Sequence, residues 1–327
     1  MASATAPRRT RGTPARLERA ARLLLAPCAV SLCIGLCAGL TSGCSLQRFV
    51  VDRAGNALSG DNTVFASDDD PDLIAAATPF GLKLTESLLA KSPEHRGLLL
   101  SAAQGFTQYA YAFVEMPADE TELHDVAAAE AARERARRLY RRARDYGLRG
   151  LAVGHPDFES RLRADPDAAL SQAGPEDVAL LYWTAASWGA LVSLGKNEPS
   201  LLADLPLVQG LADRALALDE SFGQGSVHLL ELSLAMSAPR PQEERLAAAR
   251  RHFDRALALS QGTQASVFVT WAESVSIPAG QAGDFDAMIG RALAIDADAH
   301  PQVRLANRIY QRRARWLQEH SEQFFNR

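Results

Sequence analysis

Apolar residues recur along most of the chain at the three- and four-residue spacing of amphipathic helices. Proline and glycine separate the helical stretches: Pro93 follows the first, and Pro117 is expected to stop the second. No alternating apolar and polar pattern of useful length predicts a strand, so the sequence predicts an all-α fold. The expected helices span 72–90, 98–115, 123–151, 175–195, 201–218, 222–237, 242–260, 264–276, 284–296 and 301–320, with a short helix at 157–163 inside a broken segment.

A short motif recurs in several of these helices. In the stretch LAAARRHFDRALALS, a small residue at Ala249 precedes an aromatic ring at Phe253 and a second small residue at Ala256. This order is typical of the second helix of a tetratricopeptide repeat. The sequence therefore predicts degenerate tetratricopeptide-like helix-pair repeats stacked as a short superhelical array, and a plain helical bundle with alanine-rich seams is the alternative. The near-copies are Ala136, Tyr140 and Ala143; Val208, Ala212 and Ala215; and Phe285, Ile289 and Ala292.

The amino-terminal segment has the pattern of a bacterial lipoprotein signal. Six arginines precede an apolar run, which ends in Thr41, Ser42, Gly43 and Cys44. This order predicts cleavage before Cys44 and attachment of lipid to that cysteine, which would anchor the chain to a membrane. A transmembrane anchor is the alternative, although the apolar run reaches 18 residues only if Pro27 and two glycines are counted.

The domain organisation follows from this prediction. Residues 1–43 are expected to be the signal peptide, and 44–66 the lipidated cysteine and a flexible tether. Residues 67–320 are expected to form the helical repeat domain, and 321–327 a tail. Asp70 and Pro71 suit the amino-terminal cap of the first helix.

Cysteine use and charge favour a periplasmic protein. Three of the four cysteines lie in the predicted signal and the fourth is Cys44, so the mature chain would have no disulfide. Without residues 1–43 the chain has 29 basic and 38 acidic residues, a net charge of about −9, which argues against nucleic-acid binding. Ser45, and not aspartate, follows Cys44; by the sorting rule of some Gram-negative bacteria, this favours the outer membrane.

Searches for catalytic and metal-binding motifs find none. The chain has no H-E-x-x-H, G-x-S-x-G or C-x-x-C, and its seven histidines have no ligand-like spacing. We therefore expect no enzyme activity, no metal site and no cofactor.

Aromatic residues are concentrated in the helices expected at 98–115 and 175–195. If these are the first helices of two repeats, they line one inner face, where aromatic and amide side chains could hold a small amphipathic ligand or a partner's helix. The alternative is that most of these rings fill the core. Tyr111 lies off the stripe that Phe106, Tyr109 and Phe113 share, so it is the sharper candidate. The residues predicted to line this groove are Gln104, Gln108, Tyr109, Tyr111, Tyr182, Trp183 and Trp188.

Several blocks carry a family resemblance. They include the segments ASDDDP, QYAYAFVE, ARRLYRRARDYG and DVALLYWTAASWGALVSLGKN, and they extend over most of residues 60–318. The sequence resembles the T component associated with tripartite ATP-independent periplasmic (TRAP) transporters. The resemblance implies a periplasmic lipoprotein whose partner is the substrate-binding P subunit, with a channel for hydrophobic or carboxylated ligands. It implies no catalytic residues.

Two functions stay open at this point. One is a TRAP-associated scaffold that docks the P subunit and holds or passes a ligand. The other is a generic outer-membrane assembly scaffold of the tetratricopeptide type with no small-molecule ligand. The sequence also leaves open whether the chain forms a homo-oligomer.

Overall fold

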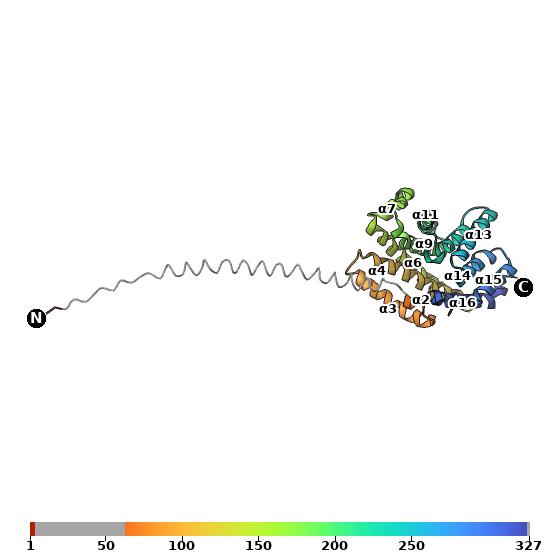
Figure 1. Ribbon diagram of the computed structural model, residues 1–327, viewed down its shortest axis with the longest axis horizontal. Coiled ribbons are helices and arrows are strands. Elements are labelled where there is room, and N and C mark those ends of the chain that lie inside the picture. The colour runs from red at the N-terminus through yellow and green to blue at the C-terminus, as the bar shows by residue number, and fades with distance from the viewer. Residues whose placement is uncertain (4–62, 326–327) are drawn as a thin grey trace. The chain divides into compact units, whose positions relative to one another are not determined.

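The computed structural model describes residues 1–3 and 63–325, so Cys44 and the predicted signal lie outside the described residues. Between residues 63 and 325 every regular element is a helix, which confirms the all-α prediction (Figure 1). The α-helices are α2 (Thr63–Ala66), α3 (Pro71–Leu89), α4 (Arg96–Ala110), α5 (Met116–Glu122), α6 (Val126–Gly154), α7 (Phe158–Ala164), α8 (Pro166–Ser171), α9 (Val178–Leu194), α10 (Pro199–Leu202), α11 (Leu205–Leu218), α12 (Ser226–Ser237), α13 (Gln242–Leu259), α14 (Ala265–Trp271), α15 (Ala282–Leu293), α16 (Arg304–Glu319) and α17 (Ser321–Phe324). Short 3₁₀ turns are η2 (Pro175–Asp177), η3 (Phe222–Gln224) and η5 (Pro301–Val303), and π-helical turns are η1 (Tyr111–Glu115) and η4 (Ala272–Ser276).

Local chemistry fixes where several helices begin. The Asp70 carboxylate accepts hydrogen bonds from the backbone N–H groups of Asp72 and Leu73, each at 3.0 Å, and Pro71 occupies the first helical position. These contacts satisfy donors that have no partner inside the helix. Asp125 caps the 29-residue helix α6 in the same way through the N–H of Ala128.

Successive helices pack against one another. Helix α4 lies on α6, α6 on α9, and α9 on α11; further along, α12 lies on α13 and α14 on α15. Gly147 of α6 allows a close approach to α9, because a Cβ atom there would lie 2.1 Å from the Thr184 hydroxyl oxygen. The motif residues at this kind of contact are buried: Tyr140 is 0% exposed and Phe253 is 2% exposed.

Pro117 does not act as the sequence analysis expects. Helix α4 continues through η1 into α5, so Pro117 does not end it. In both π-helical turns the residue before a proline donates its backbone N–H to a carbonyl five residues back: Met116 to Tyr111, before Pro117, and Ile277 to Ala272, before Pro278. A proline ring clashes with the carbonyl four residues before it in a regular α-helix, and the wider π turn relieves this contact.

Helices from near the two ends of the described chain meet. Helix α16 lies beside α2 and α3, where the Arg304 guanidinium donates to the Ser67 carbonyl at 3.1 Å and Arg312 pairs with Asp72 at 3.1 Å (Figure 1). Helix α2 therefore belongs to the folded part, although the sequence placed it in the tether.

The predicted tail at 321–327 is also wrong for its first five residues. The first four form α17, and the fifth, Phe325, is 6% exposed, with its ring 5.2 Å from that of Phe285.

Candidate functional site

Helix α9 has one face that its neighbours cover only in part. Between Ala179 and Ala190, half-buried residues recur along this face at three- and four-residue intervals, and the other residues of that stretch are buried. Tyr182 and Trp183 are the large side chains on it, with ring centroids 4.8 Å apart, and Phe222 lies 5.3 Å from Tyr182. The other members of the face are small: Ala179, Ala186, Gly189 and Ala190.

A second pair of aromatic rings, Tyr111 and Tyr310, belongs to the same region. Tyr111 begins the π turn η1, and its ring centroid is 6.1 Å from that of Tyr310 on α16. Burial raises the pKa of both hydroxyl groups, and Tyr182 adds to the rise in the pKa of Tyr310. The structure therefore brings together two of the predicted groove residues, Tyr111 and Tyr182, around a tyrosine from the other end of the chain.

The remaining predicted groove residues lie elsewhere. Tyr109 is on the α6 side of α4, where Arg135 donates to its hydroxyl oxygen at 3.2 Å. Gln104 is half-buried and Gln108 is exposed. Trp188 is fully buried, and its indole N–H donates to Asp204 at 3.1 Å. The expectation that Trp188 lines a groove is corrected: α6 and α11 cover its helix face, and the ring belongs to the core.

A buried ion cluster lies next to Tyr111. The Arg313 guanidinium, in a side chain that is only 10% exposed, donates from Nε to Glu273 and from Nη2 to Asp119, each at 2.7 Å. Asp119 also accepts from Arg133 at 3.0 Å. The remaining nitrogen of Arg313, Nη1, is buried and has no hydrogen-bond partner in the described part of the chain. Glu115 joins the cluster from η1 and accepts a hydrogen bond from the hydroxyl of Tyr140.

The π turns place two of these carboxylates where water is scarce. Glu115 ends η1 and Glu273 lies in η4, so each π turn contributes one acidic group to the cluster. Burial raises the pKa of Glu115 to about 7, and it also raises the pKa of Glu273 against the opposing effect of Arg313. With a pKa of about 7, the Glu115 carboxyl would gain or lose its proton near neutral pH.

This cluster forms the polar end of a pocket of about 330 Å³. Most of the other side chains in the wall are apolar, and Glu122 and Gln323 are the polar ones among them. The pocket therefore suits a small amphipathic molecule whose polar group reaches the ion cluster. The residues that line it are Asp119, Glu122, Leu123, Glu273, Ile277, Arg313, Trp316, Leu317, Gln323 and Phe324.

The sequence analysis did not single out the ionic half of this site. Glu115 and Glu273 could have been identified from the sequence, because each is an acidic residue in an apolar helix a few positions before a proline. Arg313 carried none, because Arg312 and Arg315 flank it in a helix that looks uniformly basic on one side.

The described part of the chain offers neither a candidate metal site nor a candidate membrane span. Residues 1–3 and 63–325 contain no group of three or more histidine, cysteine, aspartate or glutamate side chains that could hold a metal ion. Across the same residues, none of the helices combines the length and the apolar character that crossing a bilayer requires.

Comparison with known proteins gives two matches. A family model described as TRAP transporter T-component matches residues 67–325. An uncharacterized protein of Treponema pallidum (strain Nichols) is 30% identical to the chain over 304 residues, which cover 88% of this chain and 94% of that protein.

Proposed function

Because the chain belongs to the TRAP transporter T-component family and is thus an accessory component of such a transporter, we propose that it is a periplasmic lipoprotein that docks the substrate-binding P subunit and holds a small ligand. Lipid on Cys44 would anchor it, with the outer membrane favoured. We propose no catalytic role for it. The family match over residues 67–325 is the observation that carries the proposal.

We further propose that the helix pairs are degenerate tetratricopeptide-like repeats. The three motif positions of each copy support this, because all of them are at most 2% exposed and lie where successive helices pack. Small residues at such positions let two helices approach closely, and one large ring fills the space between them. The array would then present its first helices, including α9, on one inner face.

The ligand of this proposal is hydrophobic or carboxylated. Its apolar part would pack on the side chains of Ile277, Trp316 and Phe324, and a carboxylate would approach the unpaired Nη1 of Arg313. Glu273 and Asp119 compete for the same guanidinium, so a bound carboxylate is favoured when neighbouring acids are protonated. Because the pKa of Glu115 is about 7, we expect carboxylate binding to strengthen as the pH falls from 8 to 6.

Calorimetric titration of the folded chain tests both parts. The first titrant is the P subunit of the same transporter, and the second is decanoate, a carboxylate with an apolar tail. Ile277→Asn should weaken decanoate binding at least about tenfold, since a polar amide replaces part of the pocket wall. Leu202→Asn, at a position 41% exposed on α10, is the matched control and should bind as the wild type does.

The two titrations have separate consequences. Decanoate binding that is absent, or that is unaffected by Ile277→Asn, removes the ligand from the proposal and leaves docking in place. P-subunit binding that is absent removes docking, and the chain would then be a scaffold for other proteins.

A further inference from the structure

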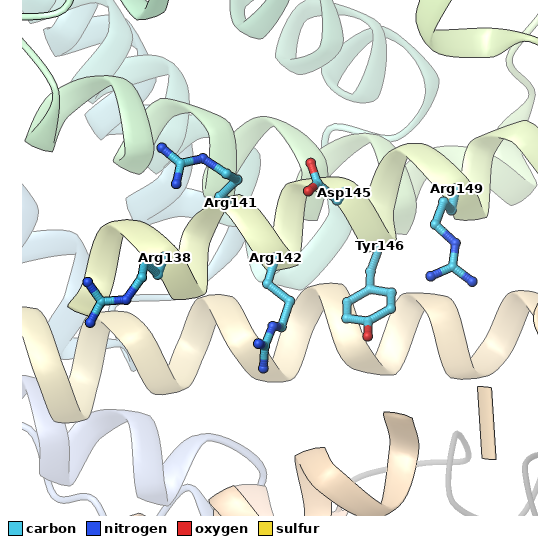
Figure 2. A pocket seen from close by; sticks show the side chains of 6 residues that line it. All are labelled: Arg138, Arg141, Arg142, Asp145, Tyr146 and Arg149. Atoms are coloured by element: carbon cyan, nitrogen blue, oxygen red, sulfur yellow. The ribbon is translucent and has the colours of Figure 1, made fainter. Parts of the chain in front are cut away.

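A row of arginines follows one side of helix α6, away from the pocket described above. Arg138, Arg142 and Arg149 point to the same side as Tyr146, whereas Arg141 and Asp145 lie along the other edge (Figure 2). These six side chains line an open hollow of about 410 Å³. The first and last arginines are 11 residues apart, so the row extends about 16 Å along the helix.

Aromatic rings hold two of these guanidinium groups in place. Arg142 lies over Phe106 at 5.2 Å from the ring centroid, and Arg149 lies over Tyr146 at 5.3 Å. Tyr146 is itself fixed, because its hydroxyl donates to Glu86 at 2.9 Å. A guanidinium on a ring face keeps most of its N–H donors free to bind an anion. The donors are therefore positioned before any partner arrives.

The acidic side chains near the arginine row already bind other basic side chains. Asp145 binds Arg144 on its other side, with the shorter of two contacts at 2.7 Å. Glu86 binds Lys83 at 2.5 Å and is only 3.4 Å from Arg142.

Arg138 and Arg141 have little compensation from acidic groups of the described chain. Arg138 has a single long contact with Glu134 at 3.4 Å, and Arg141 has no ion pair with any residue of the described chain. The row therefore keeps a local positive charge on a chain whose net charge is −4.

We propose that this arginine row is a docking surface for a partner protein that presents acidic side chains at helical spacing. The row lies along a single helix, so carboxylates on one partner helix would meet its arginines in register. Tyr146 lies half-buried between the arginines and offers an apolar contact that a protein side chain can use. The inference rests on the proposed function, in which the partner is the P subunit.

The test compares two triple variants of the folded chain with the wild type. Arg138→Gln, Arg142→Gln and Arg149→Gln together remove three charges from the row. Arg240→Gln, Arg251→Gln and Arg315→Gln remove three charges from other exposed positions and serve as the matched control. Binding of the P subunit is measured at low and high salt, with thermal melting of each variant alongside. Binding to phosphatidylglycerol vesicles is measured in parallel.

We expect the row variant to bind the P subunit about tenfold more weakly, within the roughly threefold to hundredfold range for three exposed ion pairs. Its binding should also depend less on salt than that of the wild type. The control variant should bind as the wild type does, and all three should melt alike.

Three results would overturn the inference. Equal weakening in both variants would assign the effect to net charge. Unchanged P-subunit binding in the row variant, with loss of vesicle binding, would assign the row to a membrane surface. Failure of the wild type to bind the P subunit would overturn the proposed docking function together with this inference.

Discussion

Replacing Arg313 with leucine removes a buried cation that lies between two half-buried carboxylates. Asp119 and Glu273 would then face each other without their shared partner, and neither could turn fully to water, since their side chains are only 31% and 25% exposed. Breaking a buried pair in this way typically costs 3–5 kcal/mol. Asp119 keeps Arg133 at 3.0 Å, so we expect the lower value, about 3 kcal/mol.

For a chain of this size, about 3 kcal/mol corresponds to a fall in melting temperature of roughly 6–12 °C. The measurement is urea unfolding followed by circular dichroism. Adding Glu273→Gln to Arg313→Leu should recover part of the loss, because the double variant no longer buries that unpaired charge. Lowering the pH should also shrink the loss, because burial raises the pKa of Glu273 and the free carboxylate then takes up a proton.

The neighbouring residue provides a matched control. Arg312 pairs with Asp72 at the surface, where the two side chains are 58% and 85% exposed. Arg312→Leu should therefore change the free energy of unfolding by no more than about 0.5 kcal/mol. An equal effect of the two substitutions would refute the reasoning, and so would a further loss when Glu273→Gln is added.

Three other predictions follow from the same structure. Glu115→Gln should stabilise the protein above pH 7 by up to about 3 kcal/mol relative to the wild type, and not at pH 4. The reason is that burial raises the pKa of Glu115 to about 7 in the folded wild type. The free energy of unfolding of the wild type therefore declines as the pH rises from about 4.5 through 7. Urea titrations at several pH values would detect this decline. Phe253→Ala should cost about 3–5 kcal/mol because the ring is 2% exposed, whereas Phe80→Ala, at a ring 76% exposed, should cost under about 0.5 kcal/mol in the same assay. Cys44→Ser should leave an unprocessed precursor without diacylglycerol, and mass spectrometry that finds normal lipid on this variant would contradict the anchor.

Helix boundaries could be predicted well where local chemistry decides them. The expected spans 72–90 and 242–260 differ by at most one residue from α3 and α13. Caps and apolar periodicity act within a few residues, so the sequence contains them. The effect of Pro117 could not be predicted in this way. The π turn η1 lets the helix continue past Pro117, and this turn also depends on what Tyr111 and Glu115 contact in the folded chain.

The candidate site could be predicted only in part. Tyr111 stood out because its helical angle separates it from the stripe that includes Phe106 and Tyr109. Trp188 could not be assigned from sequence, because helices α6 and α11 bury it. Arg313 has the local sequence of an exposed arginine, and its burial is decided by partners 40 and 194 residues away. Contacts of that range leave no periodic pattern.

The contact of α16 with α2 and α3 has a consequence for how the molecule unfolds. In an open stack of helix pairs the outermost pairs have one neighbour each, so fraying begins at the two ends. Here α16 lies against α2 and α3, and Arg313 links it to α5 as well. The two ends therefore protect each other, and release of α16 would uncover both at once. Backbone amides in α3 and α16 should then exchange with deuterium at matching rates, as parts of one cooperative unit.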